Sequence, residues 1–438
     1  MDAVKTINYI ISIVFILCYS YQFMYMLVPY IIKDRPRKPV KPHRYAVLIS
    51  ARNEEAVIAK LIESIRRQSY DLGLVTTFVV ADNCTDATAR VAAEAGAVVF
   101  ERFDTSRVGK GYALRYLLRK IDELFPERPF DGYFVFDADN VLEENYIEEM
   151  NKTFSDGYEI VTSYRNSKNF GDNWISSGYA LWFLRESQFL NHARMKLGTS
   201  CAVSGTGFLF SQKVLDECGG WNFFLLTEDI EFTVHNVVRG LKIGYCHEAV
   251  LYDEQPTRFR QSWNQRLRWA RGYLQVFGKY GGDLLAGIAH GSFSCFDMTM
   301  NIMPAAVLTF VGVFANGAAA VLGLATGRDI SVVGESLLSM LLNTYLTLIV
   351  IGGGATISEW KRIYAPTWKK IAFTLTFPFF MFTYIPISFA ALFARRVTWK
   401  PIVHTRSASL QEIRAAAETL SGKIACCLLY TSPSPRDA

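Results

Sequence analysis

Hydrophobic positions along the chain form two different patterns. In the first, long stretches carry no charged residue at all. Each stretch exceeds the roughly 20 residues with which a helix crosses a bilayer, so we expect transmembrane helices rather than buried core helices, which are seldom so long and so apolar. The four stretches are 6–32, 298–326, 336–358 and 371–394.

The second pattern fills residues 45–256, which have an ordinary soluble composition. Here short apolar runs, typical of buried strands, alternate with segments of helical periodicity. This alternation predicts an α/β domain with a mainly parallel sheet and helices on both of its faces. A dinucleotide fold or a phosphate-loop ATPase gains no support, because no glycine-rich loop follows the first run. The apolar runs are 45–49, 77–81, 97–100 and 133–136.

Polar motifs follow three of these runs directly. They are Ser-Ala-Arg-Asn-Glu-Glu at 50–55, Asp-Asn-Cys-Thr-Asp at 82–86 and Asp-Ala-Asp at 137–139. Parallel sheets bind ligands at the carboxyl ends of their strands, so these side chains should meet at one edge. Asp137 and Asp139 can share one hard cation and a diphosphate. Asp-x-Asp is common by chance, and its position at a strand end is what favours the functional interpretation.

Further along the domain, Thr-Glu-Asp at 227–229 precedes a predicted helix. Acidic residues there can simply interact with the helix dipole. Alternatively, Asp229 can act as a general base, because a sugar hydroxyl must lose its proton as it attacks. Ser-Gly-Thr-Gly at 204–207 and Gly-Lys-Gly at 109–111 each allow two interpretations as well: an ordinary turn, or a ligand contact through Gly205, Thr206 and Lys110.

An amphipathic helix is predicted within 257–297, where Gln265, Arg268 and Trp269 share one face. A flat aromatic ring beside a guanidinium suits a sugar linked to phosphate. The other interpretation is a surface helix with one exposed Trp. On the flanks of the apolar face, Arg266 and Arg271 are expected to reach lipid phosphates.

The positions of the Lys and Arg residues predict how the chain is oriented across the membrane. Six Lys and Arg residues lie in the Pro-rich tether 33–44, directly after the first apolar stretch, and a second basic cluster lies in 359–370. Basic residues next to a span favour the cytoplasmic side, so we expect a multi-pass plasma-membrane protein with a cytoplasmic catalytic domain. For the tail, 395–426, the charges favour the cytoplasm while the number of spans favours the outside, and both sides stay open.

Composition narrows the function further. The formal net charge of +5 is explained by basic clusters that attract anionic membrane lipids, so we expect no nucleic-acid partner. The cysteines and the six histidines are expected to be structural or surface residues. The last segment, 427–438, looks foreign to the rest of the sequence, and we leave it out of the fold prediction.

The ordered set of Asp82, Asp137-Ala-Asp139, Thr227-Glu-Asp229 and Gln265-x-x-Arg268-Trp269 resembles the membrane-embedded processive family 2 glycosyltransferases. These include cellulose, chitin and hyaluronan synthases and the bacterial poly-N-acetylglucosamine and chito-oligosaccharide synthases. The motifs cover about residues 45–280. The resemblance implies a GT-A fold, a UDP-sugar donor, Mg²⁺ or Mn²⁺, and inversion to a β-linkage. The first strand departs from the family by ending in Ile-Ser-Ala-Arg-Asn-Glu, and only three predicted spans follow the domain.

The same resemblance implies a role for each motif residue. On the donor side, Asp82 contacts uridine in a pocket lined by Asn53 and Glu54, Lys110 and Asp137 contact the diphosphate, and Asp139 binds the metal together with Asp137. On the acceptor side Asp229 is the base. The remaining implied contacts to the acceptor or the leaving diphosphate are Gly205, Thr206, Glu228, Gln265, Arg268 and Trp269.

Three functions compete at this point. The first is processive synthesis of a β-linked polysaccharide or oligosaccharide, with an accessory export subunit as a further partner. The second is addition of one sugar to a membrane lipid. The third is a non-catalytic transporter or scaffold, which the intact acidic motifs disfavour. The sequence does not identify the donated sugar.

Overall fold

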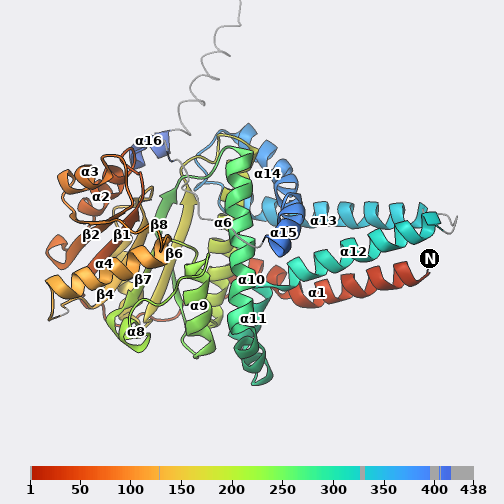
Figure 1. Ribbon diagram of the computed structural model, residues 1–438, viewed down its shortest axis with the longest axis horizontal. Coiled ribbons are helices and arrows are strands. Elements are labelled where there is room, and N and C mark those ends of the chain that lie inside the picture. The colour runs from red at the N-terminus through yellow and green to blue at the C-terminus, as the bar shows by residue number, and fades with distance from the viewer. Residues whose placement is uncertain (1, 128, 326–330, 395–403, 405, 416–438) are drawn as a thin grey trace, which may run out of the picture.

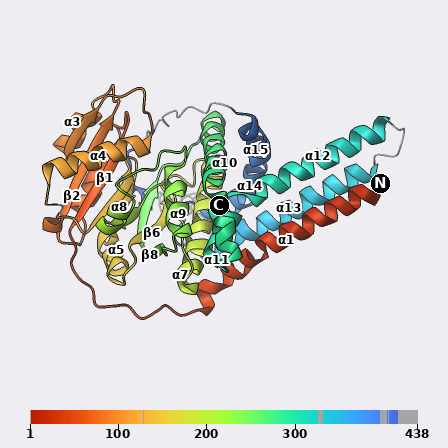
Figure 2. The same ribbon diagram turned by 60° about the horizontal axis from the view of Figure 1, so that its bottom comes forward.

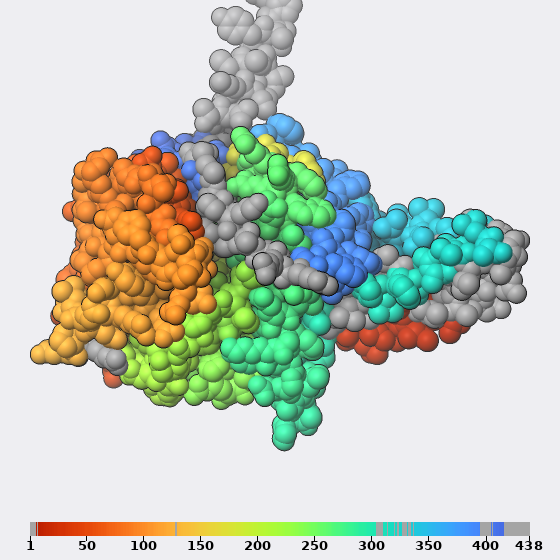
Figure 3. Space-filling view, in the orientation of Figure 1, coloured from red at the N-terminus to blue at the C-terminus, as the bar shows by residue number. Residues whose placement is uncertain are grey.

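The computed structural model describes residues 2–127, 129–325, 331–394, 404 and 406–415. An α/β domain forms one end of the molecule, and the helices α1 (Asp2–Ile31), α12 (Pro304–Ala325) and α13 (Ser331–Ser358) project together from the other end (Figure 1, Figure 3). Between them stands the long helix α10 (Phe259–Ala289), followed by α11 (Phe293–Ile302).

One eight-stranded sheet runs through the domain, in the order β3-β2-β1-β4-β7-β6-β8-β5. The neighbouring pairs β3–β2, β2–β1, β1–β4 and β6–β8 are parallel, whereas β7 is antiparallel to both β4 and β6. This mixed sheet with helices confirms the predicted GT-A α/β fold. The strands are β1 Tyr45–Ala51, β2 Val75–Asp82, β3 Val98–Arg102, β4 Gly132–Asp137, β5 Val141–Leu142, β6 Ile160–Ser167, β7 Phe208–Ser211 and β8 Gly244–Asp253.

Strand β1 shows why the sheet is covered on both faces. Its residues from Tyr45 to Ile49 are all apolar. Because successive side chains point to opposite faces of the sheet, both faces must be covered by other apolar residues. Ala46 and Leu48 join the core under α4 (Lys110–Leu124), α6 (Trp174–Arg185) and α9 (Glu228–Val238). Val47 and Ile49 point the opposite way, into the core under α2 (Ile58–Arg66), α3 (Thr88–Glu94) and α5 (Tyr146–Ser155).

The remaining elements are short helices and one pair of longer ones. They are the short helices η1 Leu72–Leu74, α7 His192–Leu197, α8 Gln212–Glu217 and α16 Leu410–Ala415, the π-helical turn η2 Glu186–Asn191, and the pair α14 Thr367–Phe382 and α15 Tyr384–Phe393.

Three helices in the described part of the chain are long and apolar enough to cross a membrane: Asn8–Ile31, Leu337–Ser358 and Thr367–Phe393. Leu17 and Leu338, for example, are each more than two-thirds exposed, as lipid-facing side chains would be. The predicted stretch 298–326 begins inside α11 and continues as α12 after Pro304, a residue that suits a first helical turn. Of the predicted tail, 395–426, the structure describes residues 404 and 406–415, and the predicted end segment, 427–438, lies outside the described residues.

A buried ion pair ties the projecting helices to the domain. Arg194 of α7 donates from Nε and Nη2 to the two carboxylate oxygens of Asp297 in α11, at 2.7 and 2.8 Å. Tyr21 and Tyr25 of α1 donate to the same carboxylate, at 2.7 and 3.0 Å. Both charged side chains are fully buried. Three segments far apart in the sequence therefore depend on one carboxylate.

One prediction about the amphipathic helix is wrong. Arg266 does not reach lipid phosphates, because it is fully buried between α10 and α14. It donates to Thr383 Oγ1 at 2.6 Å and lies 4.4 Å from the ring centre of Phe380. A helical wheel could not show this partner, since it lies more than a hundred residues further along the chain.

Asp297→Asn should destabilise the protein by about 3 kcal/mol, because it leaves the buried Arg194 without its counter-charge. Thermal unfolding in detergent, compared with the exposed control Asp283→Asn on α10, measures the effect. Equal unfolding temperatures for the two variants would contradict this role of the ion pair.

Candidate active site

The carboxyl ends of the central strands open into a single cavity of about 1790 Å³. This exceeds the roughly 300–1,000 Å³ typical of small-molecule sites. The predicted residues that line it are Glu54, Asp82, Lys110, Asp137, Asp139, Gly205, Glu228, Asp229, Gln265, Arg268 and Trp269. The structure thus brings together residues that the sequence spreads over more than two hundred positions.

Asp82 ends β2 and is held by Arg102 at the end of β3. The Arg102 Nη1 donates to Asp82 Oδ1 at 2.5 Å, and Asn83 Nδ2 donates to the same oxygen at 3.1 Å. Burial raises the pKa of the Asp82 carboxyl, and Arg102 opposes that rise. Among the described residues, no hydrogen bond of this side chain uses Oδ2, which leaves one acceptor available on the cavity wall.

The loop after β1 places Asn53 against the loop that follows Asp82, and Glu54 on the cavity wall. Asn53 has a left-handed backbone, with φ of 58°, and its side chain accepts from the backbone N–H of Thr85 at 2.8 Å. Glu54 contacts His404 Nδ1 through both carboxylate oxygens, at 3.0 Å. Burial alone would lower the pKa of His404, but Asp139 and Glu54 raise it to about 10, so this imidazole is a cation.

His404 is a site residue that sequence reasoning missed, having been counted among structural or surface histidines. It lies 350 positions from Glu54 and carries no motif, so only the fold reveals it. Nearby, Arg406 donates from its backbone to Glu254 at 3.0 Å and pairs with Asp172 at 2.6 Å. This part of the tail therefore lies against the acidic end of the sheet.

Lys110 and Asp137 form the next group. Lys110 begins α4, and its Nζ donates to Asp137 Oδ1 at 2.5 Å and to the carbonyl of Gly205 at 2.8 Å. The hydroxyl of Thr206 accepts from the backbone N–H of Asp137 at 2.9 Å. Lys110 is thus a positioned cation and not a solvated turn residue.

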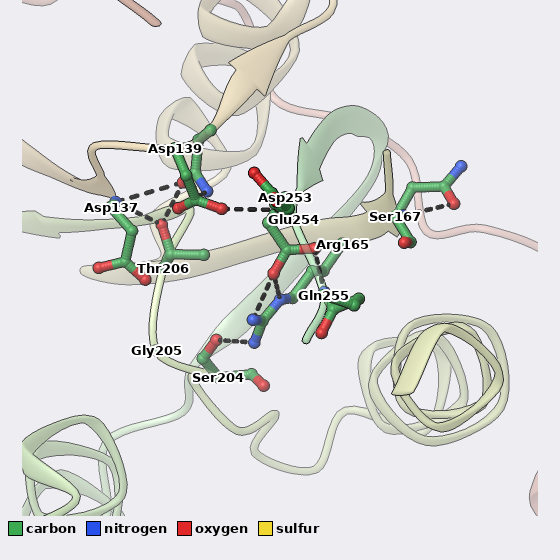
Figure 4. A network of polar contacts seen from close by, with 12 residues as sticks. Asp137, Asp139, Arg165, Ser167, Ser204, Gly205, Thr206, Asp253, Glu254 and Gln255 are labelled. Carbon is green, nitrogen blue, oxygen red and sulfur yellow. Dashed lines mark hydrogen bonds and ion pairs between the residues drawn. The ribbon is translucent and has the colours of Figure 1, made fainter. Parts of the chain in front are cut away.

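Asp139 lies deeper, only 4% exposed, and accepts from the backbone N–H of Glu254 at 2.8 Å. Behind it, Arg165 donates to Asp253 at 2.7 Å (Figure 4). Lys168 donates to the Asp139 carbonyl. Burial would raise the pKa of the Asp139 carboxyl, but His404 and Lys168 lower it overall. Asp139 is therefore ionised at neutral pH.

The carboxylate oxygens of Asp137 and Asp139 suit a divalent cation only when a substrate supplies further ligands. Among the described residues, no three His, Cys, Asp or Glu side chains form a ready metal site. Mg²⁺ is commonly held by one or two carboxylates plus phosphate oxygens. Asp137 and Asp139 fit that mode, in which a diphosphate completes the coordination.

Glu228 and Asp229 begin α9 and also line the cavity. Burial raises the pKa of the Asp229 carboxyl. Burial and the neighbouring Asp229 raise the pKa of Glu228 to about 7, while Lys110 and Arg268 oppose them. A carboxylate whose affinity for protons is raised in this way suits a general base.

From α10 come Gln265, Arg268 and Trp269. Arg268 donates to the carbonyl of Leu226 at 2.6 Å, which fixes it beside the acidic pair. Trp269 packs edge-on against Tyr179, with ring centres 5.7 Å apart, and is half-buried, so it is not the exposed Trp of a surface helix. Gln265 Oε1 is buried and accepts no hydrogen bond from the described residues. An orphan acceptor on a cavity wall is typical of a ligand contact.

Comparisons with known proteins agree with this geometry. The family model described as "Glycosyltransferase like family 2" matches residues 42–272. The beta-monoglucosyldiacylglycerol synthase of Nostoc sp. is 28% identical over 283 residues, which cover 60% of this chain and 57% of that protein. The poly-beta-1,6-N-acetyl-D-glucosamine synthase of Staphylococcus aureus is 23% identical over 239 residues, covering 52% and 54%. The chain therefore spans little more than half the length of these curated relatives.

A solved structure resembles the whole fold. The mannosyltransferase PcManGT from Pyrobaculum calidifontis, in complex with GDP-Man and Mn²⁺, superposes with a TM-score of 0.56 at 14% identity, covering 90% of this chain and 100% of that one. At this identity the likeness concerns the fold alone. The family model, in contrast, matches more than half of the sequence and includes every motif residue of the cavity, so the chain belongs to glycosyltransferase like family 2.

Proposed function

We propose that this protein transfers one sugar from a UDP-sugar to a hydroxyl group of a membrane lipid, with inversion to a β-linkage. The observation that carries the proposal is the continuity of the cavity. Its acidic end holds Asp137, Asp139 and Asp229, and its far end is lined by apolar side chains of the candidate membrane helices, such as Phe15, Phe23, Met26, Leu341, Leu346 and Leu392.

Apolar walls favour an acceptor with alkyl chains. Burying such chains gains about 0.8 kcal/mol per CH₂ group, whereas a polar glycan would gain little there. The similarity to a beta-monoglucosyldiacylglycerol synthase supports the same choice. This lipid acceptor, and not the polymer that ranked first in the sequence analysis, therefore fits the cavity better.

Polysaccharide synthesis remains the second candidate, because Trp269 lines the cavity where a glycan could stack and a relative is named as a poly-N-acetylglucosamine synthase. An accessory export subunit would be needed only in that case.

On the donor side, Asp82 Oδ2 would accept the single ring N–H of uracil. Asp137 and Asp139 would hold Mg²⁺ or Mn²⁺ against the diphosphate. When bound, the cation neutralises the negative charge that develops on the leaving UDP. Lys110 and Arg268 would supply further positive charge there, since both act electrostatically on Glu228.

On the acceptor side, Asp229 takes the proton of the attacking hydroxyl. Its carboxylate lies beside Gly205, where an added Cβ would come within 3.7 Å of Asp229 Oδ2. A glycine there leaves room for the acceptor hydroxyl close to the base.

We further propose that the domain works on the cytoplasmic side of the plasma membrane, where the basic tether 33–44 would contact anionic lipid headgroups. Lipid acceptors would then enter the cavity from the membrane and meet the donor at its polar end.

The nature of the product tests the proposal. Membranes incubated with each radiolabelled UDP-sugar should give label that extracts into chloroform–methanol as a single small lipid. Label retained in a long, water-soluble polymer would overturn the lipid acceptor in favour of the second candidate.

Asp229→Asn should reduce transfer by about 10²–10⁴-fold, because an amide keeps the shape of the side chain but cannot take the proton. UDP binding, measured on the same preparation by calorimetry, should hardly change. Transfer above about a tenth of the wild-type rate would show that another group is the base.

Asp139→Ala should abolish the Mn²⁺ dependence of UDP-sugar binding, because one of the few hard oxygen ligands is lost. The exposed Asp283→Ala serves as the matched control. If the Asp139 variant still binds UDP-sugar more tightly with Mn²⁺ than without it, the metal is held elsewhere.

A further inference from the structure

Glu186 lies on the cavity wall between the catalytic end and the membrane helices, and no motif drew attention to it. It begins the π-helical turn η2, directly after α6. Such turns are rare and are frequent at functional sites, because the extra residue in the turn redirects side chains. Burial raises the pKa of the Glu186 carboxyl, while nearby arginines oppose that rise.

The Glu186 carboxylate is almost without partners. Within the described residues, its one side-chain hydrogen bond comes from the hydroxyl of Ser204, at 3.3 Å. Three arginines lie close enough to affect it electrostatically, yet none forms an ion pair with it in the described part of the chain. Each of them donates elsewhere: Arg165 to Asp253, Arg185 to Gln22, and Arg194 to Asp297.

A half-buried carboxylate on a cavity wall still needs hydrogen-bond donors. Leaving a charged acceptor unsatisfied costs more than the roughly 1–3 kcal/mol of a neutral group. Since the protein commits its own cations to other partners, the missing donors come from what fills the cavity, which is water or a ligand.

The position of Glu186 shows which part of the ligand would supply them. Ser204 donates to Glu186, and the next residue, Gly205, lies against Asp229 Oδ2. Gly205 has φ of +76°, a left-handed turn that lets one short loop touch both carboxylates. A molecule whose reacting hydroxyl faces Asp229 therefore presents its neighbouring atoms to Glu186.

We propose that Glu186 binds a second hydroxyl of the acceptor, and that the acceptor is a lipid whose head is a sugar or another polyol. This inference rests on the proposed function and narrows its substrate class. A lipid with one hydroxyl, such as diacylglycerol, would give its only O–H to Asp229 and would leave Glu186 unsatisfied.

The test compares two acceptors in detergent with the full chain: diacylglycerol and a monoglucosyl lipid with the same acyl chains. The wild type should favour the glucosyl lipid in kcat/KM. In Glu186→Gln, which keeps the size of the side chain, that preference should fall about tenfold or more, as expected when a hydrogen bond to a charged group is lost. Glu217→Gln, an exposed glutamate, is the control, and UDP affinity shows that each variant is folded.

Two results would overturn the inference. One is a wild type that prefers diacylglycerol, and the other is an unchanged preference in Glu186→Gln. A third arm, with a soluble gluco-oligosaccharide, separates this inference from the proposed function. Transfer to the oligosaccharide alone would reject the lipid acceptor, and the KM of Glu186→Gln for that oligosaccharide would then still decide whether Glu186 binds a hydroxyl.

Discussion

The structure depends on the neutralisation of carboxylates that are crowded into one buried edge of a sheet. Like charges at such distances repel strongly wherever water is excluded. Four of these carboxylates are therefore matched with a cation that comes from another element: Asp82 with Arg102, Asp137 with Lys110, Asp253 with Arg165, and Glu54 with His404. These carboxylates can lie close together because the fold places a cation next to each of the four. A donor diphosphate with its metal ion would enter a site whose charges are already close to balance.

The same need for balance joins the domain to the helices that would lie in the membrane. Arg194 and Asp297 link α7 to α11, and Arg266 links α10 to α14, all in fully buried surroundings. Buried charges tolerate little displacement, because a lost partner is costly to replace. The helix that carries Gln265, Arg268 and Trp269 is thereby held firmly between the sheet and the long helices. Such rigidity matters for transfer, since a misplacement of about 1 Å can cost two orders of magnitude in rate.

The sequence predicted the features that depend on neighbouring residues, and it missed those that depend on contacts between distant segments. The strands β1, β2, β3 and β4 were found from local runs, and the motifs at their ends fell together because parallel strands share one edge. The antiparallel strand β7 and the pairing of β5 with β8 escaped prediction, because they depend on contacts between distant segments. For the same reason Arg266 was misplaced and His404 missed: their partners lie 117 and 350 positions away. Glu186 escaped because a π-helical turn leaves no simple periodicity.

Under the proposed function, the continuous cavity couples acceptor binding among the membrane helices to sugar transfer in the α/β domain. Acyl chains that occupy its apolar end would displace water, and the polar end would then lose part of its contact with solvent. Electrostatic interactions strengthen as water leaves, so the attraction of Lys110 and Arg268 for the departing diphosphate would grow as the acceptor binds. The raised pKa of Asp229 would serve the same step, since a partly desolvated carboxylate takes a proton more readily. Binding of the lipid would in this way prepare the charges that the transfer needs.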